Sequence, residues 1–68
     1  MNYYLGVDIG SVNAKLALID EKARVVQFDT EKVTSSPRAA VSSLIARLGE
    51  GFNLKEIIAA GVSGSGRA

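Results

Sequence analysis

The first third of the chain alternates apolar and polar positions with the two-residue period of a β-strand. The alternation predicts one strand over about Tyr3–Ile9 and a second over about Asn13–Ile19, with a two-residue turn at Gly10-Ser11 between them. The second strand becomes apolar on both faces toward its end, which is typical of a strand covered on both sides. A third strand, over about Arg24–Thr30, carries more polar residues and is therefore predicted at an edge of the sheet.

A helical pattern follows the three strands. Ser35-Ser36-Pro37 combines capping serines with a proline that the first helical turn tolerates, and Gly49 or Gly51 is expected to end the helix. The last strand is predicted over about Ile57–Val62, and its apolar residues on both faces predict a buried, central position in the sheet. Apolar residues spaced i, i+3, i+4 and i+7 form one stripe along the helix: Ala40, Val41, Leu44, Ile45 and Leu48.

The predicted order β-β-β-α-β defines an α/β fold with a mixed sheet. Hairpins make the first three strands antiparallel, and the helix acts as a right-handed crossover that leaves the last strand parallel to the third. We place this last strand beside the first, on the side away from the second. The segments Asp8–Ser11 and Gly64–Arg67 then lie at the same edge of the sheet, where open α/β sheets commonly bind ligands.

The composition narrows the possible functions. The chain has 68 residues, so we expect one domain or less. Hydrophobic residues make up 47% of it and charged residues 22%, which predicts a folded rather than a disordered chain. Its net charge of +1 gives no electrostatic reason to expect nucleic acid or an anionic membrane as a partner. Cysteine and histidine are absent, which excludes disulfides and argues against a zinc site. Arg38 and Arg47 on the predicted helix are expected to be surface charges.

The chain shows no signal for a membrane or for secretion. Its longest uninterrupted apolar run, Leu16–Ile19, is far shorter than the roughly 20 residues of a membrane helix. The strand pattern begins directly after the first residues, without a basic leader or a signal-like apolar run. We therefore expect a cytoplasmic protein with no nucleic-acid or membrane partner.

The segment from Asp8 to Lys15 carries the first candidate chemistry. Gly10 allows close approach of the backbone and tolerates a positive φ, and successive N–H groups at such a turn can bind an anion. Ser11 and Asn13 add side-chain donors, and Lys15 offsets phosphate charge as a point cation. Asp8 would repel a phosphate, so its predicted role is to hold Mg²⁺ through water. The alternative is a plain hairpin with a tight turn and a solvated lysine.

A second motif, Gly61–Arg67, follows the last strand and can open a helix whose N-terminus binds an anion. Arg67 can pair with phosphate or carboxylate. The segment lacks the G-K-[ST] ending of a Walker A loop, and no G-x-G-x-x-G fingerprint follows the first strand. The alternative for this motif is a flexible tail.

Together these residues resemble a known superfamily. Asp8-Ile9-Gly10-Ser11 through Lys15, followed by an apolar strand that ends at Asp20, is similar to the first phosphate motif of acetate and sugar kinases, heat-shock chaperone ATPases and actin. The β-β-β-α-β order is similar to the first part of their ribonuclease-H-like fold. The likeness is strongest to the activases of 2-hydroxyacyl-CoA dehydratases and the ATPase subunits of benzoyl-CoA reductases. These proteins begin with a Gly-x-Asp-x-Gly-Ser segment and end their fourth strand with Gly-x-Gly-Arg, matched here by Gly64–Arg67.

The resemblance implies that residues 1–68 form the N-terminal part of the first lobe of an actin-like ATPase domain, a partial lobe that is inactive alone. The full protein would bind ATP or ADP with Mg²⁺ in a cleft between two lobes. Asp8 would be the catalytic residue that organises the metal and its water, and segment 64–67 would lie across the cleft. The residues implied in nucleotide binding are Gly10, Ser11, Val12, Asn13, Lys15, Gly64, Ser65, Gly66 and Arg67.

The resemblance to activases also implies partners for the full protein. An activase of this kind is a homodimer that holds one bridging four-iron four-sulfur cluster, and ATP hydrolysis drives electron transfer to an acyl-CoA dehydratase or reductase. The chain has no cysteine, so we expect any cluster ligand to lie in the rest of such a protein. The second phosphate motif and the adenosine motif would also lie beyond Ala68.

Other functions stay open at this point. A carbohydrate kinase of the glycerol or xylulose kinase type has similar first strands, but it usually carries a longer, aromatic-rich segment where only Glu31–Ser36 stands here. A glucokinase or repressor of the related class fits less well, because Ser11, and not Gly-Thr, follows Gly10. From a different class, the chain can be a small α/β interaction module in which Gly10-Ser11 is only a turn.

Overall fold

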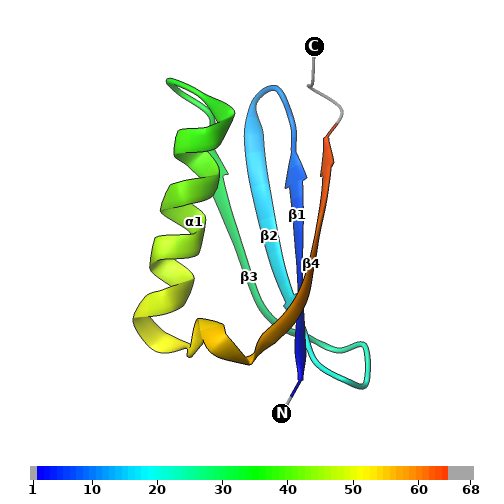
Figure 1. Ribbon diagram of the computed structural model, residues 1–68. Coiled ribbons are helices and arrows are strands. Elements are labelled where there is room, and N and C mark those ends of the chain that lie inside the picture. Colours follow the sequence, from blue (N-terminus) through cyan, green and yellow to red (C-terminus); the bar gives the residue numbers. More distant parts are fainter. Residues whose placement is uncertain (1, 65–68) are drawn as a thin grey trace.

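The computed structural model describes residues 2–64 of the protein. A four-stranded sheet and one long helix form two layers (Figure 1). The predicted β-β-β-α-β order is confirmed, and the predicted bounds of the first two strands match the observed ones. The elements are β1 (Tyr3–Ile9), β2 (Asn13–Ile19), β3 (Val25–Lys32), α1 (Pro37–Gly51), a short 3₁₀ turn η1 (Leu54–Glu56) that the pattern did not predict, and β4 (Ile57–Gly64).

The sheet has the strand order β3-β2-β1-β4. β1 and β2 form an antiparallel hairpin, as do β2 and β3, whereas β4 pairs with β1 in parallel. Two expectations are confirmed by this order: the last strand lies beside the first, and β3 lies at an edge. The crossover through α1 thus places the last strand beside the first, with the two strand ends at the same end of the sheet.

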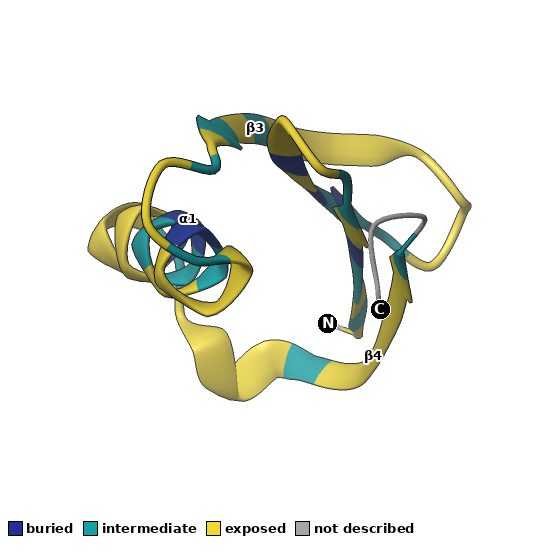
Figure 2. Ribbon diagram, turned by 90° about the horizontal axis from the view of Figure 1, so that it is seen from above, coloured by how far each residue is buried: buried dark blue, intermediate teal, exposed yellow. Residues whose placement is uncertain are grey.

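The predicted central and buried position of the last strand is wrong within this chain. β4 forms the second edge of the sheet, and only its first and last residues are partly buried. The helix packs mainly on β2 and β3, and β4 is exposed over most of its length (Figure 2). Apolar side chains such as Ile58 and Val62 therefore remain exposed. Apolar faces favour burial, but burial also requires a covering element, and the described residues supply little cover for β4.

The core lies between α1 and one face of the sheet. Leu44 and Leu48 of α1 pack with Leu16 and Leu18 of β2, and all four side chains are almost fully buried. The predicted apolar stripe therefore faces the sheet, and Figure 2 shows the buried residues gathered between helix and sheet. Other buried or partly buried residues extend this core: Tyr3, Leu5, Ala14, Val33, Ala40, Val41, Ile45, Phe52 and Ile57.

The opposite face of the sheet has no covering layer among residues 2–64. The expectation that β2 is covered on both sides is therefore wrong for this chain. Ala14, Leu16 and Leu18 are buried, whereas Lys15 is exposed and Ala17 is only partly buried, because successive side chains of a strand point to opposite faces. We call the uncovered side the open face; its residues include Tyr4, Gly6, Asp8, Lys15, Ala17, Phe28, Thr30, Gly61 and Ser63.

α1 begins and ends where its sequence signals indicate. The Ser36 hydroxyl accepts a hydrogen bond from the Ala39 N–H at 3.1 Å, and Pro37 occupies the first turn. Of the two glycines predicted to end the helix, Gly51 does so, and Phe52 follows as the cap. No helix within the described residues is long and apolar enough to cross a membrane.

Arg47 is exposed, as its position on the helix predicts, but it also connects α1 to β3. Its guanidinium crosses from α1 to β3, where it donates to the carboxylates of Asp29 at 2.8 Å and Glu31 at 2.7 Å, and to the Thr30 carbonyl at 3.0 Å. The hydrogen bonds that Arg47 donates to Asp29 first, and to Glu31, raise the pKa of Arg47 above its ordinary range. The same guanidinium lowers the pKa of Asp29. The sequence pattern did not predict these contacts because it describes the helix alone and not the strand opposite.

Replacement of Leu44 by alanine tests the packing of α1 on β2. The residue is 0% exposed, and its truncation should lower the free energy of unfolding by about 2–5 kcal/mol because it leaves a cavity in the core. Leu44→Met, which roughly keeps the volume, should cost less than about 1.5 kcal/mol. Urea denaturation followed by circular dichroism measures both variants. Equal losses in the two variants would contradict the described packing.

The contact between Arg47 and Asp29 predicts a contribution to stability that acid removes. The guanidinium lowers the folded-state pKa of Asp29 below its ordinary value of 3.8. The contribution is therefore complete above that ordinary value and is lost as the pH falls through the lowered one. We expect the difference in unfolding free energy between the wild type and Arg47→Met to be largest near neutral pH and to shrink in acid, as measured by urea denaturation at a series of pH values.

Arg38→Met is the matched control for this prediction. Arg38 lies on the same helix, is exposed, and forms no ion pair among residues 2–64. Its effect on the free energy of unfolding should be small and independent of pH. An effect of Arg47→Met that does not change between neutral and acid pH would show that the arginine acts only through packing.

Candidate functional site

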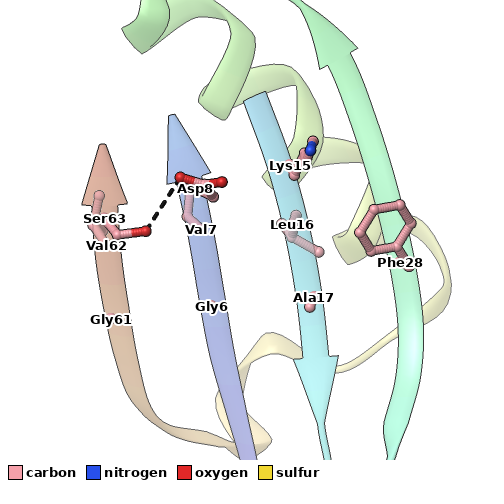
Figure 3. A pocket seen from close by; sticks show the side chains of 10 residues that line it. All are labelled: Gly6, Val7, Asp8, Lys15, Leu16, Ala17, Phe28, Gly61, Val62 and Ser63. Carbon is pink, nitrogen blue, oxygen red and sulfur yellow. Dashed lines mark hydrogen bonds between the residues drawn. The ribbon is translucent and has the colours of Figure 1, made fainter. Parts of the chain in front are cut away.

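A row of polar side chains crosses the open face near the C-terminal ends of β1 and β4. Three of its members, Asp8, Lys15 and Ser63, are exposed. Figure 3 shows these three side chains on neighbouring strands at one end of the sheet. We call the whole set the polar row; taken from β4 to β3 in the register of the sheet, it consists of Ser63, Asp8, Lys15 and Thr30.

Asp8 forms a hydrogen bond with one of its two neighbours in this row. The Ser63 hydroxyl donates a hydrogen bond to Oδ1 of Asp8, with 3.2 Å between the oxygens (Figure 3). The two residues are Cα partners on parallel strands and lie 55 positions apart in the sequence. Lys15 is the Cα partner of Asp8 on the other side, yet it forms no ion pair with Asp8 in the described part of the chain. The Lys15 ammonium is therefore available to another anion.

Small residues hollow the open face next to the polar row. Gly6, Ala17 and Gly61 are neighbours in one row of the register, and none of them raises a long side chain above the sheet. Phe28 stands at the β3 end of this row and is 60% exposed. The resulting concavity has a volume of about 510 Å³, and its lining includes three members of the polar row, Asp8, Lys15 and Ser63.

The turn between β1 and β2 lies at the same end of the sheet. The Gly10 N–H donates to the Asn13 carbonyl at 2.8 Å, so Ser11 and Val12 form the tip. The turn is therefore centred one residue later than predicted. A Cβ on Gly10 would lie 3.0 Å from the Asn13 carbonyl oxygen, so close backbone approach explains the glycine. Gly10 does not adopt a positive φ.

The hydrogen bonds of this turn decide which backbone N–H groups remain free to bind a ligand. The N–H of Gly10 is already used within the turn and does not remain as a donor. The N–H groups of Ser11 and Val12 make no hydrogen bond within residues 2–64, and both residues are exposed. The Val12 carbonyl accepts from the Val33 N–H at 2.8 Å, which ties the tip to the segment after β3. The tip thus presents two free amides beside the polar row.

The second predicted motif is described as far as Gly64. This residue is the Cα partner of Ile9, and a Cβ on it would lie 3.3 Å from the Ile9 carbonyl oxygen. The described part of the second motif therefore lies beside the first motif at one end of the sheet, as the topology predicts. Ser65, Gly66 and Arg67, which the sequence pattern assigns to nucleotide binding, lie outside the described residues.

Ser63 is the site residue that the sequence pattern did not single out. The signal that identifies it is its position, because only the observed register makes Ser63 the direct partner of Asp8, and a shift by one residue would turn it to the other face. The alternation along β4 defines two faces but does not say which one faces the helix. That assignment requires the tertiary structure.

The donor set suits a hydrated cation more than an enclosed one. Within residues 2–64, no three His, Cys, Asp or Glu side chains gather as a metal-binding group. The set consists of the exposed carboxylate of Asp8, with the Ser63 hydroxyl on one of its oxygens. One carboxylate fits Mg²⁺ held through water, because Mg²⁺ gives up its waters reluctantly.

No protein-family model matches this chain, and no curated protein matches it. Among solved structures, the chain is similar to the activator of the 2-hydroxyisocaproyl-CoA dehydratase from Clostridium difficile with bound ADPNP. The match has a TM-score of 0.66 and 26% sequence identity, and it covers 96% of this chain and 25% of the activator chain. The fold is that of a partial lobe of an actin-like ATPase.

This match confirms the resemblance to activases and the α/β, ribonuclease-H-like fold class predicted from the sequence. It extends over almost the whole chain and therefore includes both the turn after β1 and the strand that carries Ser63. The chain spans 25% of the length of that activator.

Alanine at position 10 tests the close approach in the turn. The new Cβ would meet the Asn13 carbonyl oxygen at 3.0 Å, so Gly10→Ala should lower the free energy of unfolding by about 1–3 kcal/mol. Gly61→Ala is the control, because a Cβ there meets nothing within 4 Å, and it should be neutral or slightly stabilising. Urea denaturation measures both variants, and a neutral Gly10→Ala would disprove the described turn.

Proposed function

We propose that this chain supplies the phosphate-binding part of an ATP site in an activase of 2-hydroxyacyl-CoA dehydratases. Residues 1–68 are the N-terminal part of the first lobe of its actin-like ATPase domain. The observation that carries the proposal is the polar row beside the free amides of Ser11 and Val12. The fold that carries this polar row is similar to that of an activator whose structure contains bound ADPNP.

The turn and Lys15 suit the polyphosphate of a nucleotide. Two exposed backbone N–H groups, at Ser11 and Val12, can donate to phosphate oxygens without competing bonds in the turn. The hydroxyl of Ser11 and the amide of Asn13 add neutral donors at the same end of the sheet. Lys15 brings a positive charge that its Cα partner Asp8 does not neutralise.

Asp8 suits the metal ion that accompanies such a polyphosphate. Its carboxylate is exposed on the open face and would repel phosphate unless a cation stands between them. Residue Asp8 would hold Mg²⁺ through water. When bound, Mg²⁺ offsets the negative charge of the phosphates and polarises their oxygens. Lys15 and the turn would contact the phosphates, and Asp8 would hold the metal from the neighbouring strand.

The full activity requires more than these residues. The chain spans 25% of the length of the similar activator, so ATP hydrolysis is proposed for a longer protein that includes this lobe. A homodimer with a bridging four-iron four-sulfur cluster, and electron transfer to an acyl-CoA dehydratase or reductase in the cytoplasm, belong to the same proposal. The chain itself has no cysteine for a cluster.

Two observations favour this proposal over the alternatives. The similarity to a dehydratase activator favours an activase over a carbohydrate kinase. In an interaction module with a plain hairpin, directly opposed Asp8 and Lys15 would gain stability by pairing across the strands. They do not pair among the described residues, and Asp8 takes its hydrogen bond from Ser63 instead.

Titration of the isotope-labelled chain with ATP, with and without Mg²⁺, tests the proposed function by NMR. We expect the amides of Ser11, Val12 and Asn13 to shift with millimolar apparent affinity, and Mg²⁺ to strengthen the binding. Lys15→Gln should weaken binding about fivefold because it removes one cation from the phosphates. Asp8→Asn should remove the effect of Mg²⁺ and leave binding of metal-free ATP in place.

Lys22→Gln is the matched control for Lys15→Gln. Lys22 lies in the turn between β2 and β3, at the opposite end of the sheet from Ser11 (Figure 1). Its removal should leave the affinity for ATP unchanged. Amide spectra that do not respond to millimolar ATP and Mg²⁺ would overturn the proposal and favour the interaction module.

A further inference from the structure

The one polar side chain of β4 lies where it meets Asp8. The strand reads Ile-Ile-Ala-Ala-Gly-Val-Ser-Gly, so Ser63 is its only side chain with a hydrogen-bonding group. In the parallel register Ser63 is the Cα partner of Asp8, on the open face. A shift of the register by one residue would turn the hydroxyl to the other face. The pairing therefore decides that this hydroxyl and this carboxylate meet.

The hydrogen bond between Ser63 and Asp8 does not compensate for burial of either polar group. Asp8 and Ser63 are both exposed, so water can solvate the carboxylate and the hydroxyl if they separate. A contact of this kind contributes little to the free energy of folding. Its physical effect is to restrict the rotation of the Asp8 side chain, because Oδ1 is anchored at 3.2 Å from a group on the neighbouring strand.

The choice of partner preserves the charges of the polar row. An ion pair with Lys15, directly opposite Asp8 on β2, would neutralise the carboxylate. Ser63 is a neutral donor, so Asp8 keeps its negative charge for a cation and Lys15 keeps its positive charge for an anion. The hydrogen bond also engages Oδ1 only and leaves Oδ2 to other partners.

We propose that Ser63 is a positioning residue for the metal–nucleotide site. Its hydroxyl holds Oδ1 of Asp8 so that the carboxylate is already oriented toward the water shell of a Mg²⁺ ion at the turn. The inference rests on the proposed function and adds to it a contribution from β4, the strand farthest along the chain. Ser63 touches neither metal nor nucleotide and acts only through Asp8.

The test compares variants of the whole 68-residue chain by NMR titration with ATP alone and with ATP plus Mg²⁺. Ser63→Thr and Ser63→Val form a matched pair, because their side chains have nearly the same shape and only threonine keeps the hydroxyl. The strengthening of ATP binding by Mg²⁺ should fall about fivefold in Ser63→Val, as for loss of one ordinary solvent-exposed hydrogen bond. Ser63→Thr should keep the wild-type value, and the affinity for metal-free ATP should be the same in both.

A second measurement reports positioning without any ligand. Three-bond couplings to the Asp8 carboxyl carbon should indicate one side-chain rotamer in the wild type and in Ser63→Thr, and rotamer averaging in Ser63→Val. Ser42→Ala, at an exposed serine of α1, is the control and should change neither measurement. An averaged Asp8 rotamer in the wild type would overturn the positioning role even if the chain binds ATP.

The outcomes separate this inference from the proposed function. If the wild type binds ATP and responds to Mg²⁺, and Ser63→Val responds to the same degree, Ser63 has no positioning role and the proposed function stands. If Ser63→Val weakens binding of metal-free ATP as strongly as that of the Mg²⁺ complex, the residue is only structural. If the wild type does not respond to Mg²⁺ at all, the metal site at Asp8 fails, and the role of Ser63 fails with it.

Discussion

The parallel pairing of β4 with β1 is the contact on which the candidate site depends. It forms between segments at the two ends of the chain, after α1 has carried the backbone across the sheet. β4 is largely exposed, so the free energy that holds the arrangement comes mainly from apolar burial elsewhere, between the leucines of α1 and those of β2. The hydrophobic core on one face of the sheet thus positions a polar site on the other face.

The two faces of the sheet use charge in opposite ways. On the helix side, Arg47 donates to the carboxylates of Asp29 and Glu31 and to a backbone carbonyl of β3, so these charges connect two elements. On the open face, Asp8 and Lys15 stand opposite each other without forming an ion pair in the described chain. Charges of both signs that stay unpaired suit a ligand that also carries both signs, such as a metal-bound polyphosphate.

Local patterns predicted the elements better than their surroundings. The strands from Tyr3 and Asn13, the cap at Ser36 and the helical stripe all follow from short-range spacing, and the structure confirms them. Two predictions were wrong because they concern what covers a strand. The second strand was expected to be covered on both sides but is covered on one, and the last strand was expected in the centre of the sheet but lies at its edge. The local spacing along a strand does not encode which elements cover it.

By itself, the sequence determined the order of elements and the resemblance that pointed to an ATPase lobe, because these depend on residue types a few positions apart. It also predicted roles for Asp8 and Lys15. Only the tertiary structure decided that the Gly10 N–H donates a hydrogen bond within the turn and that the Ser63 hydroxyl donates one to the Asp8 carboxylate. The physical reason is that strand register and hydrogen-bond geometry arise from contacts between distant segments, and alternation along one strand leaves them undetermined.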